Sequence, residues 1–172
     1  GEKHMTNRNF AGLLLALAAA SSLSGCTRDG PRSGNGANDV RKAALGIVAA
    51  YNAQDAHATA AFDAPDYVGM YHGTANTSGP AADEAAMKAQ MAQTRVEWRL
   101  GHDMVTIGKG GDLVVFEAPY TFLITPAQGA VMRETGNWVA IFKRQKDGSM
   151  KLWRSIASDT PAAAATATAA TR

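Results

Sequence analysis

The feature that most constrains the fold is a series of long alternating segments in the second half of the chain. We predict four strands, at 95–107, 112–125, 131–145 and 150–159. Each connecting segment contains glycine, which can adopt the positive φ that a hairpin turn requires. Consecutive strands joined by hairpins form an antiparallel sheet, and a sheet of this length must curl.

Helical spacing comes before these strands. An apolar stripe predicts a first helix that Asn38 or Asp39 can cap. The stripe consists of Val40, Ala44, Ile47, Val48 and Tyr51. Asp55 can cap a second, shorter helix that ends at Phe62, and a third helix begins at Asp83. Helices followed by an antiparallel meander indicate the α+β class.

A short strand at 67–71 completes the predicted elements. Three helices on one side of a curled sheet would close it into a cone. We therefore predict an α+β fold in which a cone-shaped, curved, antiparallel (mixed) sheet wraps around three N-terminal helices.

The order of elements and four local phrases resemble the SnoaL-like branch of the nuclear transport factor 2 fold. The phrases are Tyr51–Asp55, Phe62–Asp66, Gly111–Val115 and Gly136–Ser149, within a resemblance that covers 39–159. The resemblance implies the cone fold, and dimers through the sheet are common among such proteins. It does not imply one function, because members include isomerases, cyclases, dehydratases and proteins that only bind or oligomerise.

The N-terminus carries a targeting pattern. Arg8 precedes an apolar run, Phe10–Ala20, which is shorter than the roughly 20 residues that span a bilayer. Leu23-Ser24-Gly25-Cys26 follows and resembles the bacterial lipobox, which implies cleavage before Cys26 and a lipid on its thiol. The alternative is an ordinary secretory signal with a chance cysteine. Thr27, in place of the Asp that holds lipoproteins at the inner membrane, favours the outer membrane on the periplasmic side.

These patterns divide the chain into five parts. We interpret 1–4 as an expression scar, 5–25 as the lipoprotein signal peptide and 26–38 as a flexible tether rich in Gly, Ser, Asn and Pro. Residues 39–160 form the SnoaL-like domain, and 161–172 form a disordered Ala/Thr tail.

Composition and motifs argue against several partners. The chain has 17 basic and 15 acidic residues, a balance that gives no electrostatic footprint for a nucleic acid. The sequence has no glycine-rich phosphate loop before a helix, no recognised metal-ligand spacing and no nucleophile elbow. We expect no cofactor, no metal and no nucleic-acid partner.

Strand alternation predicts which side chains face the inside of the cone. In 112–125 the inward set is uniformly apolar or aromatic: Val114, Phe116, Ala118, Tyr120, Phe122 and Ile124. In 95–107 it is Val96, Trp98, Leu100, His102 and Met104. Both faces of 131–145 are largely apolar, so we expect a cover on the outer side, which a homodimer through the sheet would supply.

The inward side chains predict a cavity for a small apolar or aromatic ligand. We expect its ligand-binding residues to be Tyr51, Tyr71, Trp98, Phe116, Tyr120 and Trp138. His72 and His102 are the candidate catalytic groups. His102 could instead be a core histidine, or a bulge at Gly101 could turn it outward, and His72 could simply be solvated. The tyrosines and tryptophans could equally be packing residues.

The resemblance also implies where a steroid isomerase of this fold would carry its catalytic groups. The base belongs at Met70-Tyr71-His72, the oxyanion tyrosine at Ile47 and the second acid near Val139 and Ala140. None of the three groups is present, although His72 could replace the base.

Two functions therefore stay open. The first is an exported, lipid-anchored domain that binds a small ligand. The second is an isomerase or dehydratase that transfers a proton on a small apolar substrate, with His72 or His102 as base.

Overall fold

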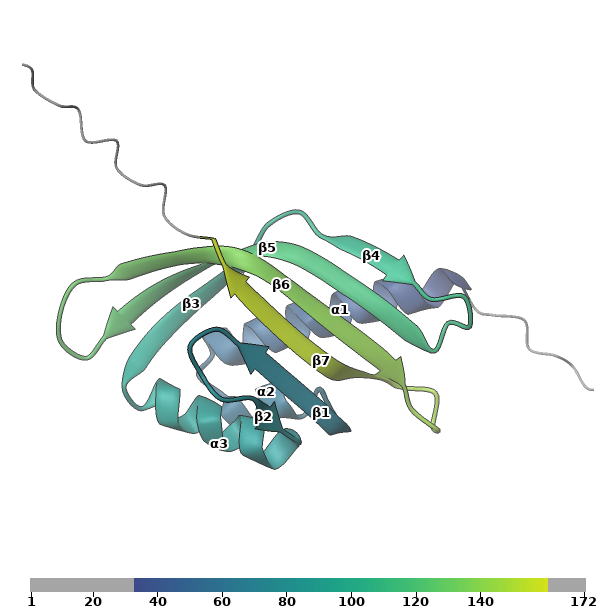
Figure 1. Cartoon of the computed structure of the whole chain (residues 1–172), viewed down its shortest axis with the longest axis horizontal. Helices are drawn as coiled ribbons and strands as arrows, with labels where there is room; N and C mark the ends of the chain where they lie inside the picture. The colour runs from purple at the N-terminus through teal and green to yellow at the C-terminus, as the bar shows by residue number, and fades with distance from the viewer. Residues whose placement is uncertain (1–32, 161–172) are drawn as a thin grey trace, which may run out of the picture.

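The computed structural model describes residues 33–160 and confirms the predicted α+β class (Figure 1). The elements are α1 (Ser33–Asn52), α2 (Ala56–Ala60), β1 (Asp63–Tyr71), β2 (Thr77–Ser78), α3 (Pro80–Met91), β3 (Thr94–Leu100), β4 (Met104–Ile107), β5 (Leu113–Pro126), β6 (Met132–Arg144) and β7 (Met150–Asp159). The predicted scar, signal peptide, lipidation at Cys26 and C-terminal tail lie outside the described residues.

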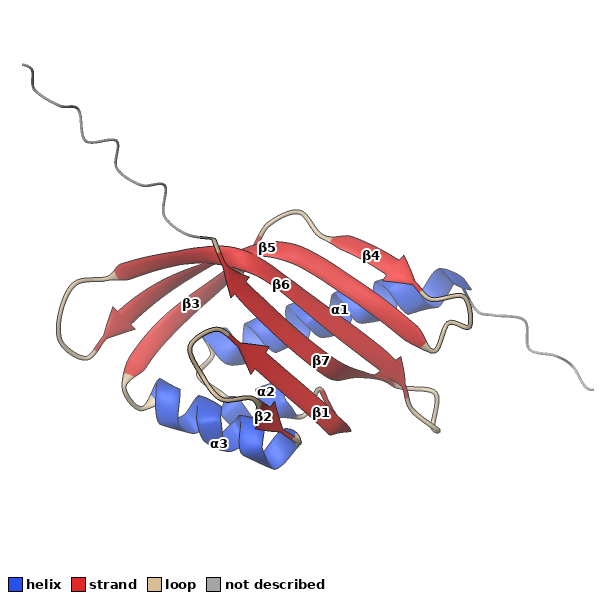
Figure 2. Ribbon diagram, viewed as in Figure 1, coloured by secondary structure: helices blue, strands red, loops and turns tan. Residues whose placement is uncertain are grey.

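The sheet is mixed and curved, as predicted. Its strand order is β2-β1-β7-β6-β5-β3, and β4 also pairs with β5. Neighbouring strands are antiparallel except β1 and β7, which are parallel. Figure 2 shows α1 crossing one face of the sheet, with α2 and α3 beside β1 and β2. The parallel pairing of β1 with β7 places β1 near one edge of the sheet, where only the two-residue β2 lies outside it.

Helix α1 begins earlier than the sequence predicts. The last six residues of the predicted tether, 33–38, belong to this helix. Gly36 is buried and extends the apolar stripe by one turn before Val40, facing Ile107 and Val114 of the sheet. A glycine-rich segment forms a flexible tether when its glycines are exposed to solvent. Here the sheet covers Gly36, so the segment is part of the helix.

The phrase at the end of α1 fixes the helix to the sheet. The Asn52 side chain donates to the Trp98 carbonyl at 2.9 Å and accepts from the Trp98 amide at 2.7 Å. Asp55 then caps α2, as predicted, by accepting from the Ala58 amide at 2.8 Å. These bonds hold the indole of Trp98 under the helix.

Other element boundaries shift by a few residues. Helix α3 begins at Pro80 because proline is favoured in the first turn, so Asp83 lies inside the helix. Strand β1 begins at Asp63 and runs through Pro65, where the sequence predicts a break. The ladder between β1 and β7 is irregular in this stretch, which accommodates a residue that has no amide hydrogen.

The predicted strand 95–107 is interrupted in its middle. Leu100 of β3 pairs with Tyr120, whereas Met104 of β4 pairs with Glu117. One more residue therefore lies between these pairs on this segment than on β5. An extra residue of this kind, as in a β-bulge, reverses which side chains face inward.

This reversal corrects the prediction for His102. Trp98 faces the core as predicted, at 8% exposure, but His102 is exposed and Met104 is 60% exposed. Val105 and Ile107 pack against the core instead. The predicted inward position of His102 is wrong, and the outward alternative holds.

The core lies between the helices and the concave face of the sheet. The buried side chains of β5 and β6 are even-numbered, as predicted for 112–125, and they include Phe116, Trp138 and Phe142, each at 2% exposure or less. Burial of such side chains contributes most of the stability of a domain of this size. No helix within residues 33–160 is long and apolar enough to cross a membrane.

Candidate functional site

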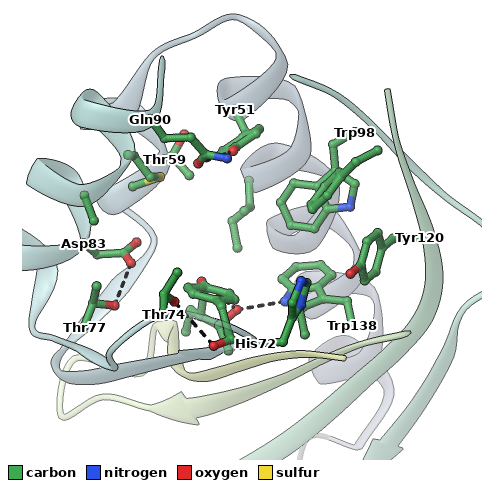
Figure 3. A pocket seen from close by; sticks show the side chains of 18 of the residues that line it. Tyr51, Thr59, His72, Thr74, Thr77, Asp83, Gln90, Trp98, Tyr120 and Trp138 are labelled. Atoms are coloured by element: carbon green, nitrogen blue, oxygen red, sulfur yellow. Dashed lines mark hydrogen bonds between the residues drawn. The ribbon is translucent and has the colours of Figure 1, made fainter. Parts of the chain in front are cut away.

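A cavity of about 440 Å³ lies between the helices and the concave face of the sheet (Figure 3). Its walls come from α1, α2 and α3 and from β1, β2, β3, β5, β6 and β7. Aromatic side chains that line it are Tyr51, Tyr67, Tyr71, Trp98, Tyr120, Phe122 and Trp138. Polar side chains that line it are Thr59, Asp63, His72, Thr74, Thr77, Asp83, Gln90, Glu134 and Ser155. Apolar walls with a few polar groups are the usual form of a small-molecule site.

One wall is an aromatic cluster centred on Trp98. Its ring meets Tyr51 at 5.6 Å, Phe122 at 5.5 Å and Trp138 at 4.8 Å between centroids, all edge to face. The Tyr51 hydroxyl donates to the Gln90 side chain at 2.7 Å, which joins α1 to α3. Burial raises the pKa of Tyr51 to about 12, so this phenol stays protonated and can only donate or accept a hydrogen bond.

A chain of hydroxyl groups crosses the floor of the cavity. The Tyr67 and Tyr71 hydroxyls are 2.8 Å apart, and Tyr71 donates to Ser155 at 3.1 Å. The Trp138 indole also donates to Ser155, at 2.9 Å. Burial raises the pKa of both tyrosines, so the chain is neutral.

Local features of β1 and β7 explain how these hydroxyl groups come together. A β-carbon on Gly69 would lie 2.6 Å from the Tyr67 hydroxyl, so only glycine leaves room for the two tyrosines of β1 to meet. On β7 an extra residue, Trp153, shifts the pairing with β6 and turns both Leu152 and Ser155 inward.

Two buried carboxyl groups lie at one end of the cavity. Asp63, at the start of β1, and Asp83, on α3, are each 6% exposed. Asp83 accepts from the Thr77 hydroxyl at 3.0 Å, whereas Oδ2 of Asp63 is buried without a hydrogen-bond partner among the described residues. Figure 3 shows Asp83 and Thr77 on the side of the cavity opposite Trp98 and Tyr120.

Burial raises the pKa of both acids. Burial, followed by the neighbouring Asp83 charge, raises the pKa of Asp63 to about 8. Burial also raises the pKa of Asp83, against the effect of the Thr77 and Tyr67 hydroxyls. Asp63 can therefore donate or accept a proton near neutral pH.

The open side of the cavity carries a histidine between acidic groups. His72 is 47% exposed, with Nε2 at 4.0 Å from Glu134 and Nδ1 at 3.8 Å from Asp159. The Tyr120 hydroxyl donates to Glu134 at 2.7 Å. Burial and the Glu134 charge raise the pKa of Tyr120, so this phenol is a fixed donor at the opening.

Most of the predicted site residues line the cavity. The structure places Tyr51, Tyr71, His72, Trp98, Tyr120 and Trp138 in its walls. Phe116 is 2% exposed, packs against Trp138 and is not among the residues that line the cavity. His102 lies outside the cavity, and Cys26 lies outside the described residues.

Sequence reasoning missed the acidic end of the cavity. Asp63 was included in the phrase before the first strand, and Asp83 was predicted only as a helix start. The only sequence signal for Asp63 was its position as a polar residue beside the apolar residues that face inward. The three positions that the resemblance assigns to isomerase catalytic groups do not carry them. Ile47, at the position of the oxyanion tyrosine, is an apolar part of the cavity wall. The positions of the base, at the end of β1, and of the second acid, on β6, have no carboxyl group.

The described residues offer little for a metal ion. Within residues 33–160, no group of three or more His, Cys, Asp and Glu side chains is placed to hold one. The chemistry available in the cavity is hydrogen bonding, aromatic contact and proton transfer by Asp63, Asp83, Glu134 or His72.

Comparisons with known proteins identify the fold. No protein-family model and no curated protein matches the sequence. The structure is similar to a ketosteroid isomerase-like protein from Erwinia carotovora atroseptica, with a TM-score of 0.65, 17% identity and coverage of 74% of this chain and 99% of that one. It is also similar to a nuclear transport factor 2-like protein with a cystatin-like fold from Novosphingobium aromaticivorans, with a TM-score of 0.61, 20% identity and coverage of 74% and 83%.

A third similar structure is a proposed dehydratase of the nuclear transport factor 2-like family from Streptomyces avermitilis. Its TM-score is 0.64, with 19% identity and coverage of 74% of this chain and 98% of that one. The domain therefore has the nuclear transport factor 2-like fold, as the resemblance implied. At such low identity the neighbours define the fold, and the function must be argued from the cavity.

Proposed function

We propose that this domain binds a small, largely apolar or aromatic molecule in the cavity beneath α1 and α3. The observation that carries the proposal is the cavity itself, about 440 Å³ in volume and walled mainly by aromatic and aliphatic side chains. Such a volume suits a molecule of about 10 to 25 non-hydrogen atoms. The fixed hydroxyl and carboxyl groups supply orientation.

A neutral, apolar fluorescent dye such as Nile red tests this proposal. We expect saturable binding to the wild-type protein and a loss of at least about tenfold in affinity for Ala157→Trp, because Ala157 lines the cavity. The matched control is Ala127→Trp on an exposed turn, which should bind like wild type. No saturable binding, or equal binding by the Ala157 variant, would overturn the proposal.

Proton-transfer catalysis is a second candidate, and Asp63 is the observation that favours it. A buried carboxyl group beside a substrate-sized cavity, with a pKa of about 8, can act as general acid or base near neutral pH. In this function His72 stands at the opening and does not need to be the base. The similar structures are at most 20% identical and define the fold alone, so the activity is argued from Asp63.

The second candidate predicts exchange of an enolisable proton. In deuterated water the protein should catalyse deuterium incorporation into a bicyclic ketone such as β-tetralone, followed by NMR. Asp63→Asn should lower the rate by about 100-fold, which is a typical contribution of a general base. Asp112→Asn, at an exposed position, is the control. A rate equal to that of the buffer would exclude this candidate.

We further propose that the domain is exported and lipid-anchored in the cell envelope, on the periplasmic side and preferably at the outer membrane. The lipobox-like Leu23–Cys26 and Thr27 support this localisation. In a Gram-negative host, labelled palmitate should be incorporated into the wild-type chain and lost in Cys26→Ser. An unlabelled wild-type chain in the soluble fraction would contradict the anchor.

A homodimer through the outer face of the sheet is also proposed. Val115, Val139, Ile141 and Ile156 are all partly exposed, and cross-strand pairs join Ile141 to Val115 and Val139 to Ile156. Sedimentation equilibrium should show a dimer that Val139→Asp dissociates, whereas Leu45→Asp on exposed α1 should not. A monomeric wild-type protein would contradict the proposal.

A further inference from the structure

We propose that the ligand of this cavity is an organic cation, namely an amine on an aromatic or apolar body whose nitrogen lies against Asp63 and Asp83. The inference rests on the proposed function, since it names the ligand class of the same cavity. Three features of the cavity carry it: an unpartnered buried carboxyl group, the charges of the lining residues and the aromatic wall.

The first feature is the acidic end itself. Asp63 and Asp83 are each 6% exposed and both line the cavity. Oδ2 of Asp63 has no hydrogen-bond partner among the described residues, whereas Asp83 has Thr77. An unpartnered buried polar atom is costly, and a ligand N–H that reaches it removes this cost.

The second feature is the charge of the walls. Three carboxyl residues line the cavity, and none of its lining residues within the described range is Lys or Arg. Lys151 lowers the pKa of Asp63 electrostatically, but it is not among the residues that line the cavity. Its Nζ donates a hydrogen bond to the Ala61 carbonyl at 2.6 Å. An anionic ligand would oppose ionisation of these acids, whereas an ammonium group would favour ionisation and pair with the carboxylate that forms.

The third feature is the distribution of aromatic rings. Trp98 lies on the side of the cavity opposite Asp83 (Figure 3), and its ring packs with those of Tyr51 and Phe122. Rings of this kind accept the apolar body of a ligand, and their faces attract a nearby cation. One end that binds a charge and one that binds a ring define an arylalkylamine-like ligand.

Cation binding predicts a particular pH dependence. The titratable groups around the acidic end are Tyr51 from α1, Tyr67 and Tyr71 from β1, Asp83 from α3 and Lys151 from β7; His57 of α2 instead pairs with Glu84 at the surface. Because burial and Asp83 raise the pKa of Asp63 to about 8, raising the pH from 6 to 8 increases its ionised fraction from about one in a hundred to about one half. The affinity for a cation should therefore rise severalfold over this range, while an alkylamine stays protonated.

Isothermal titration calorimetry with three matched probes tests the inference. Phenylbutylamine, phenylbutanol and phenylbutyrate share one aromatic body and differ in charge. At pH 7 the amine should bind at least about tenfold more tightly than the alcohol, and the carboxylate more weakly than either. Asp63→Asn and Asp83→Asn should each weaken the amine about tenfold and change the alcohol less than about twofold. Asp112→Asn, at the surface, should change neither.

The outcomes separate this inference from the proposed function. An alcohol that binds as tightly as the amine, or an amine affinity that does not rise from pH 6 to 8, overturns the cation inference and leaves the cavity as a ligand site. Binding of Nile red without binding of the amine also overturns the cation inference and leaves the cavity as a ligand site. If neither the dye nor any of the probes binds, both proposals fail.

Discussion

Replacing Asp63 with Asn should change how the stability of the domain depends on pH. In the folded chain the pKa of Asp63 is about 8, compared with 3.8 for an ordinary Asp. Between these values the folded state keeps a proton that the unfolded state has lost. Raising the pH therefore favours unfolding, the reverse of the effect of a salt-bridged carboxylate.

The size of the effect follows from the shift. Each pH unit between the two pKa values costs about 1.4 kcal/mol, which gives a loss of about 4 kcal/mol at pH 7 relative to an ordinary Asp. The side chain is only 6% exposed, but the effective dielectric constant around a buried charge lowers this cost. We expect Asp63→Asn to gain about 2 to 4 kcal/mol relative to wild type between pH 4 and pH 7.

Urea unfolding followed by tryptophan fluorescence at pH 4, 5, 6, 7 and 8 measures this difference. The buried Asn carboxamide changes the free energy of unfolding by the same amount at every pH. The readout is therefore the slope of this free energy against pH, which such a constant change does not affect. Asp112→Asn, an exposed substitution, should follow the wild-type profile. Parallel profiles for wild type and Asp63→Asn would refute the assignment of a buried, protonated Asp63.

Three further predictions concern the supports of the cavity. Asn52→Ala should lower the free energy of unfolding by about 2 kcal/mol in urea titrations, since both backbone groups of Trp98 lose a partner; a change under about 0.5 kcal/mol would contradict this. Gly69→Ala should cost about 2 kcal/mol or more, because its β-carbon would lie 2.6 Å from two hydroxyl groups, and wild-type stability would show that the strand shifts freely. Asp83→Asn should lower the pKa of Asp63 in a ¹³C NMR titration, since the Asp83 charge raises it; an unchanged pKa would place the two groups apart.

The alternation of strands predicts much of the sheet and most of the wall. Val114, Phe116 and Trp138 face the core because period-two patterning in β5 and β6 is uninterrupted. The turns between the strands are also as predicted, since Gly111, Gly129 and Gly148 all have positive φ. These features are local, and their physical cause lies within a few residues of sequence.

The remaining features depend on contacts that sequence spacing does not reveal. The extra residue before Met104 reverses the inward face and moves His102 to the surface, and its signal is only a glycine beside a histidine. Asp63 and Asp83 line the same cavity because α3 packs against β1, although the two residues are twenty positions apart in the chain. Neither residue belongs to a recognisable motif, so only the tertiary structure shows that they share one cavity.

A crystal structure of the protein with phenylbutylamine tests the central claim most directly. The account predicts electron density for the probe beneath α1 and α3, with its ring against Trp98 and its nitrogen within hydrogen-bonding distance of Asp63 or Asp83. A cavity closed by side chains, or a probe found only on the outer surface, would contradict it.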